Sequence, residues 1–239
     1  MPRRKLMRYS QNAARENVLE PGKPMYEQIR GRWNESFFKN AHPLTVELGC
    51  GGGEYTTGLA AQFPDRNFVG IDVKGDRMWR GAGLAETEGL RNVAFLRATI
   101  DFLDKFFAPG EIAEVWIPFP DPRPKEAQDK RRLTHPRYLS MYRDLMQPGG
   151  LVHFKTDDRP LFDYTLEILR EQPVTDLAYT HDLYASGDSG LLRLQHGIRT
   201  KYEQHFIKQG IKINYLHFRF RETPDGRSET GVEWVQLHP

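Results

Sequence analysis

Short apolar runs recur along the chain, and stretches with helical spacing lie between them. Five runs have the length and composition of buried strands: 44–48, 67–72, 92–96, 112–117 and 149–155. Helical spacing is clearest at 54–62, 136–147 and 159–171. This alternation predicts an α/β protein whose sheet is doubly wound and mostly parallel, with right-handed crossovers. A late pair of runs, 175–182 and 212–221, predicts an antiparallel hairpin at the C-terminal edge of the sheet.

The N-terminal segment has a different character. Residues 1–24 lack periodicity and contain a basic cluster made of Arg3, Arg4, Lys5 and Arg8. Such a segment predicts a basic, flexible arm that contacts a polyanion. Residues 25–40 have an aromatic stripe at helical spacing, which predicts one helix. We therefore expect an arm over 1–24 and a single domain over 25–239.

Composition narrows the class of protein. With 239 residues, 38% hydrophobic and 12% aromatic, the chain can bury the core of one α/β domain. Its longest apolar runs are about six residues, whereas a membrane span needs about 20, and no apolar signal-peptide core follows the N-terminus. The single cysteine, Cys50, excludes an internal disulfide. We expect a cytoplasmic, monomeric protein that has no membrane partner.

The distribution of charge is more informative than its sum. The formal net charge is only +2, but a second basic cluster lies in the middle of the chain, at Lys125, Lys130, Arg131 and Arg132. Clusters on a nearly neutral protein predict a directed contact with a polyanion. His135 and His153, near the predicted strand ends, have no partner at metal-ligand spacing, so we expect no metal.

The glycine-rich run 47–53 carries the first chemical signal. The strand 44–48 contains Glu47 near its end, glycines follow, a helical stretch comes next, and the second strand ends in Asp72. This order is that of the nucleotide-binding half of a doubly wound sheet. Gly49 and Gly51 let the backbone approach a ligand, and Asp72 can accept hydrogen bonds from ribose hydroxyls.

The residue at position 54 discriminates between nucleotides. A dinucleotide fingerprint needs Gly or Ala there, and this chain has Glu54. Carboxylates on both sides of the turn, Glu47 and Glu54, oppose a phosphate and favour a cationic ligand. S-adenosylmethionine contains a ribose, an ammonium and a sulfonium and no phosphate, so we expect it as the cofactor. Cys50, between two glycines, is expected to be a small turn residue rather than a nucleophile.

The segment after the fourth predicted strand is rich in proline. Four prolines within residues 118–124 fix φ and predict a rigid, extended loop. Such a loop holds its other side chains in defined positions, as the binding of a substrate base requires. Those side chains are an aromatic ring, a carboxylate and two cations, at Phe119, Asp121, Arg123 and Lys125. The ring and the cations can stack on a nucleotide and neutralise it.

Taken together, these motifs resemble those of the bacterial tRNA (guanine-N7-)-methyltransferase family. The shared segments are ELGCGGGEYT, FVGID, IPFPDPRPK, KRR, HFKTDD and the late Thr200-Lys201-Tyr202-Glu203. The resemblance runs from about residue 25 to 221, and its most specific parts are the FPDP-x-PK block and the T-x-Y-E stretch. It implies a Rossmann-like methyltransferase fold and the transfer of a methyl group from S-adenosylmethionine to N7 of a guanine in tRNA.

The resemblance also implies roles for individual residues. The cofactor-binding positions are Glu47, Gly49, Gly51, Asp72, Thr99 and Asp121. The substrate-binding positions are Lys125, Asp157, Thr200, Lys201, Tyr202 and Glu203, and the RNA-contacting positions are Lys130, Arg131 and Arg132. Thr99 stands where the family has a polar residue, often acidic or amide, near the adenine. Arg123 stands where the family usually has Trp, and its guanidinium plane can still stack on a base.

The expected chemistry needs little acid–base catalysis. Guanine N7 has an in-plane lone pair, so it can attack a methyl group without first losing a proton, and placement and electrostatics should dominate. A carboxylate beside the ring stabilises the positive charge that develops on the purine, and Asp121 is the first candidate for this catalytic role. Asp157 or Glu203 could accept hydrogen bonds from the guanine N1–H and exocyclic amine.

Other functions stay open at this level. A small-molecule methyltransferase would share Glu47, the glycines and Asp72, but it would not need the basic run 130–132 or the T-x-Y-E stretch. A non-catalytic RNA-binding protein with a decayed cofactor pocket is favoured by the departures at Thr99 and Arg123. A nicotinamide oxidoreductase is the weakest alternative, because Glu54 occupies the position of the third glycine.

Overall fold

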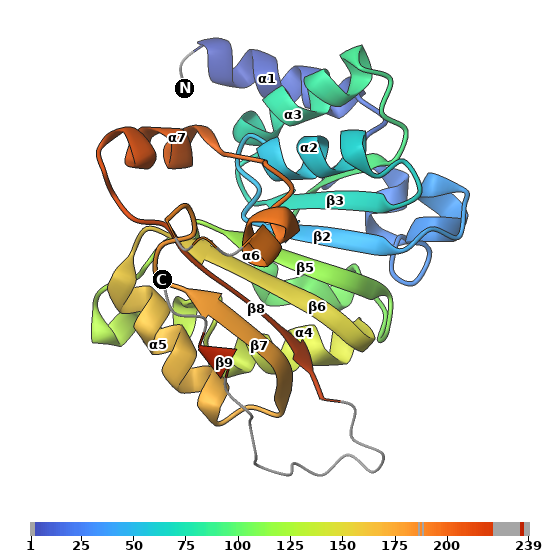
Figure 1. Cartoon of the computed structure of the whole chain (residues 1–239). Helices are drawn as coiled ribbons and strands as arrows, with labels where there is room; N and C mark the ends of the chain where they lie inside the picture. The colour runs from blue at the N-terminus through green and yellow to red at the C-terminus, as the bar shows by residue number, and fades with distance from the viewer. Residues whose placement is uncertain (1–2, 186, 188, 222–234, 237–239) are drawn as a thin grey trace. The chain divides into compact units, whose positions relative to one another are not determined.

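A computed structural model describes residues 3–185, 187, 189–221 and 235–236 of the chain (Figure 1). The chain divides into two compact units, residues 1–114 and 115–239, and the boundary falls inside strand β5 (Ile112–Pro118). Unit 1 contains, in chain order, α1 (Arg3–Ala14), β1 (Val18–Leu19), η1 (Pro24–Glu27), η2 (Trp33–Phe38), β2 (Leu44–Leu48), α2 (Glu54–Gln62), β3 (Asn67–Asp72), α3 (Gly75–Thr87), β4 (Val93–Arg97) and η3 (Ile100–Lys105).

The strands of unit 1 follow one another in the order β1-β4-β3-β2, and every neighbouring pair is parallel. The register pairs Leu48 with Ile71, and Asp72 with Arg97. Because parallel strands present their carboxyl ends at one edge, the last residues of β2, β3 and β4 lie together there. All five residues of β2 and all six of β3 are buried, as strands covered on both faces require.

Helices α2 and α3 pack against this sheet through glycines. A Cβ atom at Gly53 would lie 2.6 Å from the Phe95 ring, and one at Gly81 would lie 2.6 Å from the same ring and 2.7 Å from the Gly52 carbonyl oxygen. A real side chain cannot approach so closely, so these positions require glycine for packing. Gly53 also has a φ of 77°, in the left-handed region.

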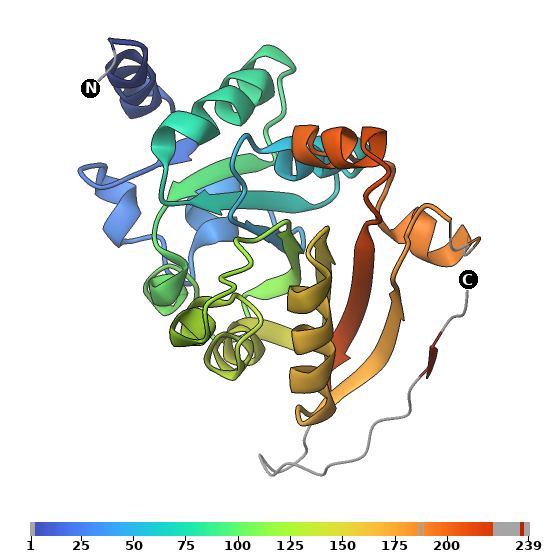
Figure 2. The same cartoon turned by 90° about the vertical axis from the view of Figure 1, so that its left-hand side faces the viewer.

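Unit 2 contains the rest of β5, η4 (Glu126–Arg131), α4 (Pro136–Leu145), β6 (Met146–Thr156), α5 (Arg159–Arg170), β7 (Val174–Thr180), α6 (Ser189–Leu194), α7 (Lys201–Lys208), β8 (Asn214–Phe220) and β9 (Val235–Gln236). Its strand order is β5-β6-β8-β7-β9. Strand β8 pairs antiparallel with both β6 and β7, while β9 pairs parallel with β7. Figure 2 shows α5 beside β6, β8 and β7. The predicted α/β class with antiparallel C-terminal strands is confirmed.

Residues 3–24, which belong to the segment predicted as a basic, flexible arm, contain a helix and a short strand. Helix α1 packs against α3, and β1 pairs with β4 through Val18 and Phe95. Polar contacts help to hold this segment: the buried Asn12 of α1 donates to the Gly75 carbonyl (2.7 Å), and Arg15, just after α1, donates to the Trp79 carbonyl (2.7 Å). A helix that docks through polar side chains leaves no apolar periodicity in the sequence, so the pattern could not reveal it.

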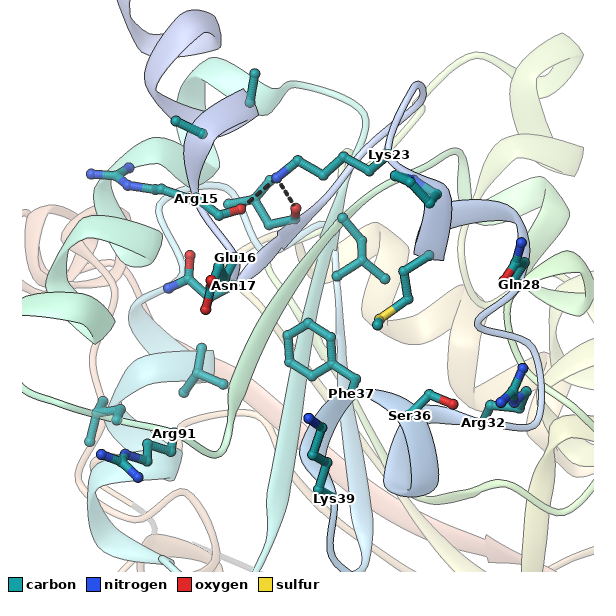
Figure 3. Close-up of a pocket in the computed structure, with 18 residues that line it drawn as sticks. Arg15, Glu16, Asn17, Lys23, Gln28, Arg32, Ser36, Phe37, Lys39 and Arg91 are labelled. Carbon is teal, nitrogen blue, oxygen red and sulfur yellow. Dashed lines mark hydrogen bonds between the residues drawn. The ribbon is translucent and has the colours of Figure 1, made fainter.

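Lys23 ties the end of this N-terminal segment together. Its Nζ donates to the backbone carbonyls of Asn12 (3.1 Å), Arg15 (2.5 Å) and Val18 (2.6 Å), and so satisfies carbonyls at the end of α1. Figure 3 shows this side chain beside Arg15, in a groove of about 1080 Å³ lined by unit 1. Two of the cations around the groove, Lys23 and Arg15, therefore bind the protein's own backbone.

The prediction of one helix over 25–40 is wrong. The segment forms two short pieces, a 3-10 turn at Pro24–Glu27 and a π-helix at Trp33–Phe38. Gly31 separates them with a φ of 72°, and its N–H donates to Glu111 Oε2 (3.0 Å), while the Trp33 N–H donates to Glu111 Oε1 (3.2 Å). A carboxylate from a distant part of the chain thus replaces the helical partners of these donors.

The proposed single domain over 25–239 stays a prediction. None of the helices in the described part of the chain is long and apolar enough to cross a membrane.

Candidate functional site

The predicted site residues divide between the two units. Glu47, Gly49, Gly51, Asp72 and Thr99 belong to unit 1, at the carboxyl ends of β2, β3 and β4. Unit 2 contains Asp121, Lys125, Asp157, the basic run 130–132 and the stretch 200–203.

Glu47 is buried at the end of β2, with 4% of its surface exposed. Its Oε2 accepts hydrogen bonds from the Thr56 N–H (2.8 Å) and from the Thr56 hydroxyl. Thr56 lies in the first turn of α2, where backbone N–H groups have no partner within the helix. Glu47 therefore holds the start of α2 against the sheet. Burial raises the pKa of Glu47 to about 8, although both hydrogen bonds from Thr56 oppose the shift.

The turn between β2 and α2 has the conformation that its glycines allow. Gly49 and Gly51 have φ values of 73° and 52°, which favour glycine. The Gly49 N–H donates to the Ile71 carbonyl (2.8 Å), which ties the turn to the end of β3. A Cβ atom added at Gly49 would meet no atom within 4 Å, so space lies beside the turn. A ligand can approach the backbone at this point.

Asp72 links the turn to the strand that follows. Its Oδ2 accepts from the Gly51 N–H (3.0 Å), and its Oδ1 accepts from the Lys74 N–H (2.8 Å). A carboxylate has about four acceptor positions, so capacity remains for two hydroxyl donors. Asp72 is 8% exposed, which fixes its orientation before any ligand arrives.

Two neighbouring residues of unit 1 have less to offer a ligand. Burial raises the pKa of the Cys50 thiol well above its ordinary value, so the thiol stays protonated and is a poor nucleophile. The guanidinium of Arg97 lies 3.5 Å from Glu20 and over the Tyr9 ring, and is therefore held within the unit. Thr99, after β4, is exposed, and its side chain does not cap η3.

The proline-rich loop of unit 2 is fixed at its start and along its length. The Phe119 N–H donates to the Lys155 carbonyl (2.7 Å), and the Phe119 ring lies 6.2 Å from the Phe206 ring. Phe119 and Arg123 have φ values of 51° and 50°, which few side chains adopt without support. Arg132 supplies part of that support, since its Nε and Nη2 lie 3.3 Å from the Arg123 carbonyl oxygen.

Asp121 projects from this loop, and its side chain is 80% exposed. Its Oδ2 lies 3.1 Å from Arg123 Nη2, so one oxygen is paired and the other is available. Lys125 is exposed at the start of η4.

The basic run 130–132 does not act as one group. Lys130 and Arg131 are exposed at the end of η4. Arg132 pairs with Asp129 (2.8 Å), lies 4.3 Å from the centre of the Tyr164 ring and donates to the loop. Its guanidinium is thus engaged within the protein, whereas its contact with RNA stays a prediction.

The T-x-Y-E stretch forms the first turn of α7. Thr200 and Glu203 make a capping box, in which the Thr200 hydroxyl accepts from the Glu203 N–H (3.1 Å). Lys201 is exposed, and Tyr202 is 65% exposed. The Glu203 side chain is completely buried and paired with Lys155, and it also accepts from the Tyr184 hydroxyl (2.5 Å). The Glu203 carboxylate is thus engaged within the protein, and its contact with a substrate base stays a prediction.

Asp157 follows the end of β6 and is half-buried. Burial raises the pKa of its carboxyl group, and the neighbouring Asp158 adds to the shift. Asp158 itself is occupied, because it caps α5 by accepting from the Leu161 N–H (2.7 Å). Of the two acids after β6, Asp157 is therefore the one placed to meet a ligand.

Sequence reasoning missed Thr56, Lys155 and Tyr184. No sequence signal marks Thr56, whose partner Glu47 lies on another element. Lys155 lies in a strand that is otherwise mostly apolar, and a lysine in such a strand is a recognisable signal, because lysine is almost never fully buried unless it is paired. Among the described residues, no group of three or more His, Cys, Asp and Glu side chains could hold a metal ion.

Comparison with known proteins shows that the chain is similar to methyltransferases over most of its length. A family model described as "Putative methyltransferase" matches residues 41–216. A tRNA (guanine-N(7)-)-methyltransferase of Cytophaga hutchinsonii is 49% identical over 222 residues, which cover 92% of this chain and 99% of that protein. One of Porphyromonas gingivalis is 48% identical over 207 residues, covering 86% of this chain and 82% of that protein.

Solved structures show the same fold. The 16S rRNA methyltransferase KamB matches with a TM-score of 0.58 at 17% identity, over 85% of this chain and 95% of that chain. A variant of the 16S rRNA (adenine(1408)-N(1))-methyltransferase from Catenulisporales acidiphilia, with cosubstrate SAM, matches with a TM-score of 0.55 at 16% identity, over 82% and 93% of the two chains. At these identities the likeness shows the fold alone.

The buried Glu47 predicts a pH dependence of stability. Unfolded, the carboxyl group releases its proton near its ordinary pKa of 4.5, whereas in the folded protein it does so near 8. Between these values the folded state binds more protons at this group, so the contribution of Glu47 to stability is greatest below pH 4.5 and falls as the pH rises, by about 1.4 kcal/mol per unit. Urea unfolding near pH 5.5 and near pH 7.5 measures this slope. Glu47→Gln keeps an acceptor for Thr56 and should flatten the slope; equal slopes in both proteins would contradict the assignment.

Proposed function

The chain belongs to the tRNA (guanine-N(7)-)-methyltransferase family, and we propose that it transfers a methyl group from S-adenosylmethionine to N7 of a guanine in tRNA. The observation that carries this proposal is 49% identity to a tRNA (guanine-N(7)-)-methyltransferase over 92% of the chain. The two rivals from the sequence, a small-molecule methyltransferase and a non-catalytic RNA-binding protein, are less well supported by relatives that share nearly the whole chain.

The residues of unit 1 fit S-adenosylmethionine. Asp72 has free acceptor capacity for the two ribose hydroxyls, and space lies beside the Gly49 backbone. Thr99, exposed after β4, is the candidate adenine neighbour. Glu47 is buried and its Oε2 accepts both hydrogen bonds from Thr56, so we assign it to orienting the turn rather than touching the ligand. When bound, the cofactor supplies a methyl group on a positively charged sulfur.

The residues of unit 2 have the properties that a guanine substrate requires. N7 needs no general base, so the protein must place the purine and stabilise the positive charge that develops on it. Asp121 supplies an exposed carboxylate from a rigid loop, and Asp157 supplies an acceptor for the N1–H and exocyclic amine. Lys125, also exposed, is proposed to bind the substrate from the same loop.

The proposed RNA contacts are the exposed cations and the exposed aromatic ring. Lys130 and Arg131 at η4 can neutralise phosphates, and Lys201 and Tyr202 in the first turn of α7 can pair with a phosphate and stack on a base. Thr200 and Arg132 act through other residues, as a helix cap and a loop support. A cytoplasmic monomer formed by a single methyltransferase domain over 25–239 is proposed as the active form.

One incubation tests the reaction. Unmodified tRNA and labelled S-adenosylmethionine are mixed with the protein, and the digested nucleosides are separated. Appearance of labelled 7-methylguanosine is expected. Labelled small molecules without labelled tRNA would favour the small-molecule methyltransferase. Cofactor binding without any transfer would support neither that alternative nor the proposed reaction.

Asp121 is expected to act on turnover rather than binding. Asp121→Asn removes the charge and keeps the shape, so kcat should fall by about 100-fold or more while KM for tRNA changes little. Asp144→Asn, at an exposed acid on α4, is the matched control and should leave both constants unchanged. Equal losses in kcat and in tRNA affinity would show that Asp121 binds rather than catalyses.

Salt dependence separates the members of the basic run. Lys130→Ala with Arg131→Ala should weaken tRNA binding and reduce the slope of log K against log salt by about 1 to 2 units, since up to two phosphate contacts are lost. Lys105→Ala with Arg143→Ala removes two other exposed cations and should preserve the slope. An unchanged slope in the first variant would identify Lys130 and Arg131 as ordinary surface charges.

A further inference from the structure

A buried ion pair joins β6 and α7 in unit 2. Lys155 Nζ pairs with Glu203 Oε1, and both side chains are 0% exposed. Two polar side chains complete the cluster: Gln195 Oε1 lies 3.3 Å from Nζ, and the Tyr184 hydroxyl lies 3.4 Å from it. The Tyr184 hydroxyl also donates to Glu203 Oε1 (2.5 Å). The proposed chemistry uses none of these contacts.

Keeping this pair buried has an energetic cost. Removal of an ammonium from water is unfavourable, and burial accordingly lowers the pKa of Lys155 to about 8, while the charge of Glu203 opposes the shift. Replacing such a pair by neutral side chains of similar volume is often neutral or stabilising. The pair therefore needs an explanation other than stability, and its geometry offers one.

The pair fixes the part of unit 2 that displays the exposed residues of α7. Glu203 is the third residue of the helix and closes the capping box with Thr200, so its position sets the direction of the first turn. Lys201 and Tyr202, the two exposed residues of that turn, lie between the two members of the box. Tyr184 and Gln195 attach the chain that precedes α7 to the same ammonium.

The backbone of Lys155 reaches the proline-rich loop. Its carbonyl accepts from the Phe119 N–H (2.7 Å), at the first residue after β5. One residue of β6 thus holds the loop that carries Asp121 through its main chain, and the first turn of α7 through its side chain. Only the second of these contacts is lost when the side chain is changed.

We propose that Lys155 is a positioning residue for the tRNA substrate, which holds Glu203 so that Lys201 and Tyr202 face the RNA in a fixed orientation. This inference rests on the proposed function. It assigns to Glu203 an indirect role in place of contact with the base. It also predicts that a change of the Lys155 side chain affects tRNA binding and not turnover. The side chain holds α7, whereas the loop that carries Asp121 stays held by the Lys155 carbonyl.

Three variants distinguish positioning from a purely structural role. Lys155→Met and Glu203→Gln each leave one buried polar partner without its counterpart, so each should lower the melting temperature. The double variant has no uncompensated charge and should recover the melting temperature. If Lys155 positions α7, KM for tRNA should rise about tenfold in Lys155→Met and stay raised in the double variant, with kcat and the Kd for S-adenosylmethionine nearly unchanged.

A stability control comes from the same unit. Thr134 and Thr165 are not part of the Lys155 cluster, and their buried hydroxyls share a hydrogen bond of 2.8 Å. Thr165→Val should lower the melting temperature without raising KM for tRNA. Recovery of KM together with the melting temperature in the double variant, or an unchanged KM in Lys155→Met, would overturn the proposal. Absence of 7-methylguanosine with the unaltered protein would instead overturn the proposed function, so the two failures are distinct.

Discussion

The glycine-rich turn of unit 1 depends on a carboxyl group buried near the end of β2. Glu47 accepts both hydrogen bonds that Thr56 can donate, and so fixes the first turn of α2 against the sheet. With the strand and the helix both fixed, the glycines between them have one path to follow. That path brings the Gly51 N–H to Asp72, which leaves part of the Asp72 carboxylate available to a ribose.

In unit 2 a buried ion pair fixes the start of a helix in a similar way. Lys155 and Glu203 are completely buried, and they connect the end of β6 to the start of α7. In both units, therefore, a buried polar side chain fixes the first turn of a helix, α2 in unit 1 and α7 in unit 2. Buried hydrogen-bonded groups can fix an element in this way because a buried polar group that loses its partner is costly. The element is therefore held in one orientation.

The predicted site residues accordingly fall into two groups, those that are engaged within the protein and those that are exposed. Motif resemblance marks positions that matter to the reaction, but it does not distinguish a residue that touches the substrate from one that holds its neighbour. Glu203 and Arg132 lie in such motifs, and their charges are engaged by Lys155, Asp129 and the Arg123 carbonyl. Asp121, Lys125 and Tyr202, from the same motifs, are exposed.

The sequence by itself determined the α/β class, the strands at 44–48 and 67–72, helix α2 at 54–62 and the acids at the strand ends. Parallel strands buried on both faces require short continuous runs of apolar residues, and such runs can be recognised locally in the sequence. Only the tertiary structure decided that α1 is a helix, that Gly31 divides the segment 25–40, and that Glu203 is buried. Each of these outcomes depends on hydrogen bonds or ion pairs between residues far apart in the chain. Their partners, Gly75, Glu111 and Lys155, leave no periodic trace in the sequence.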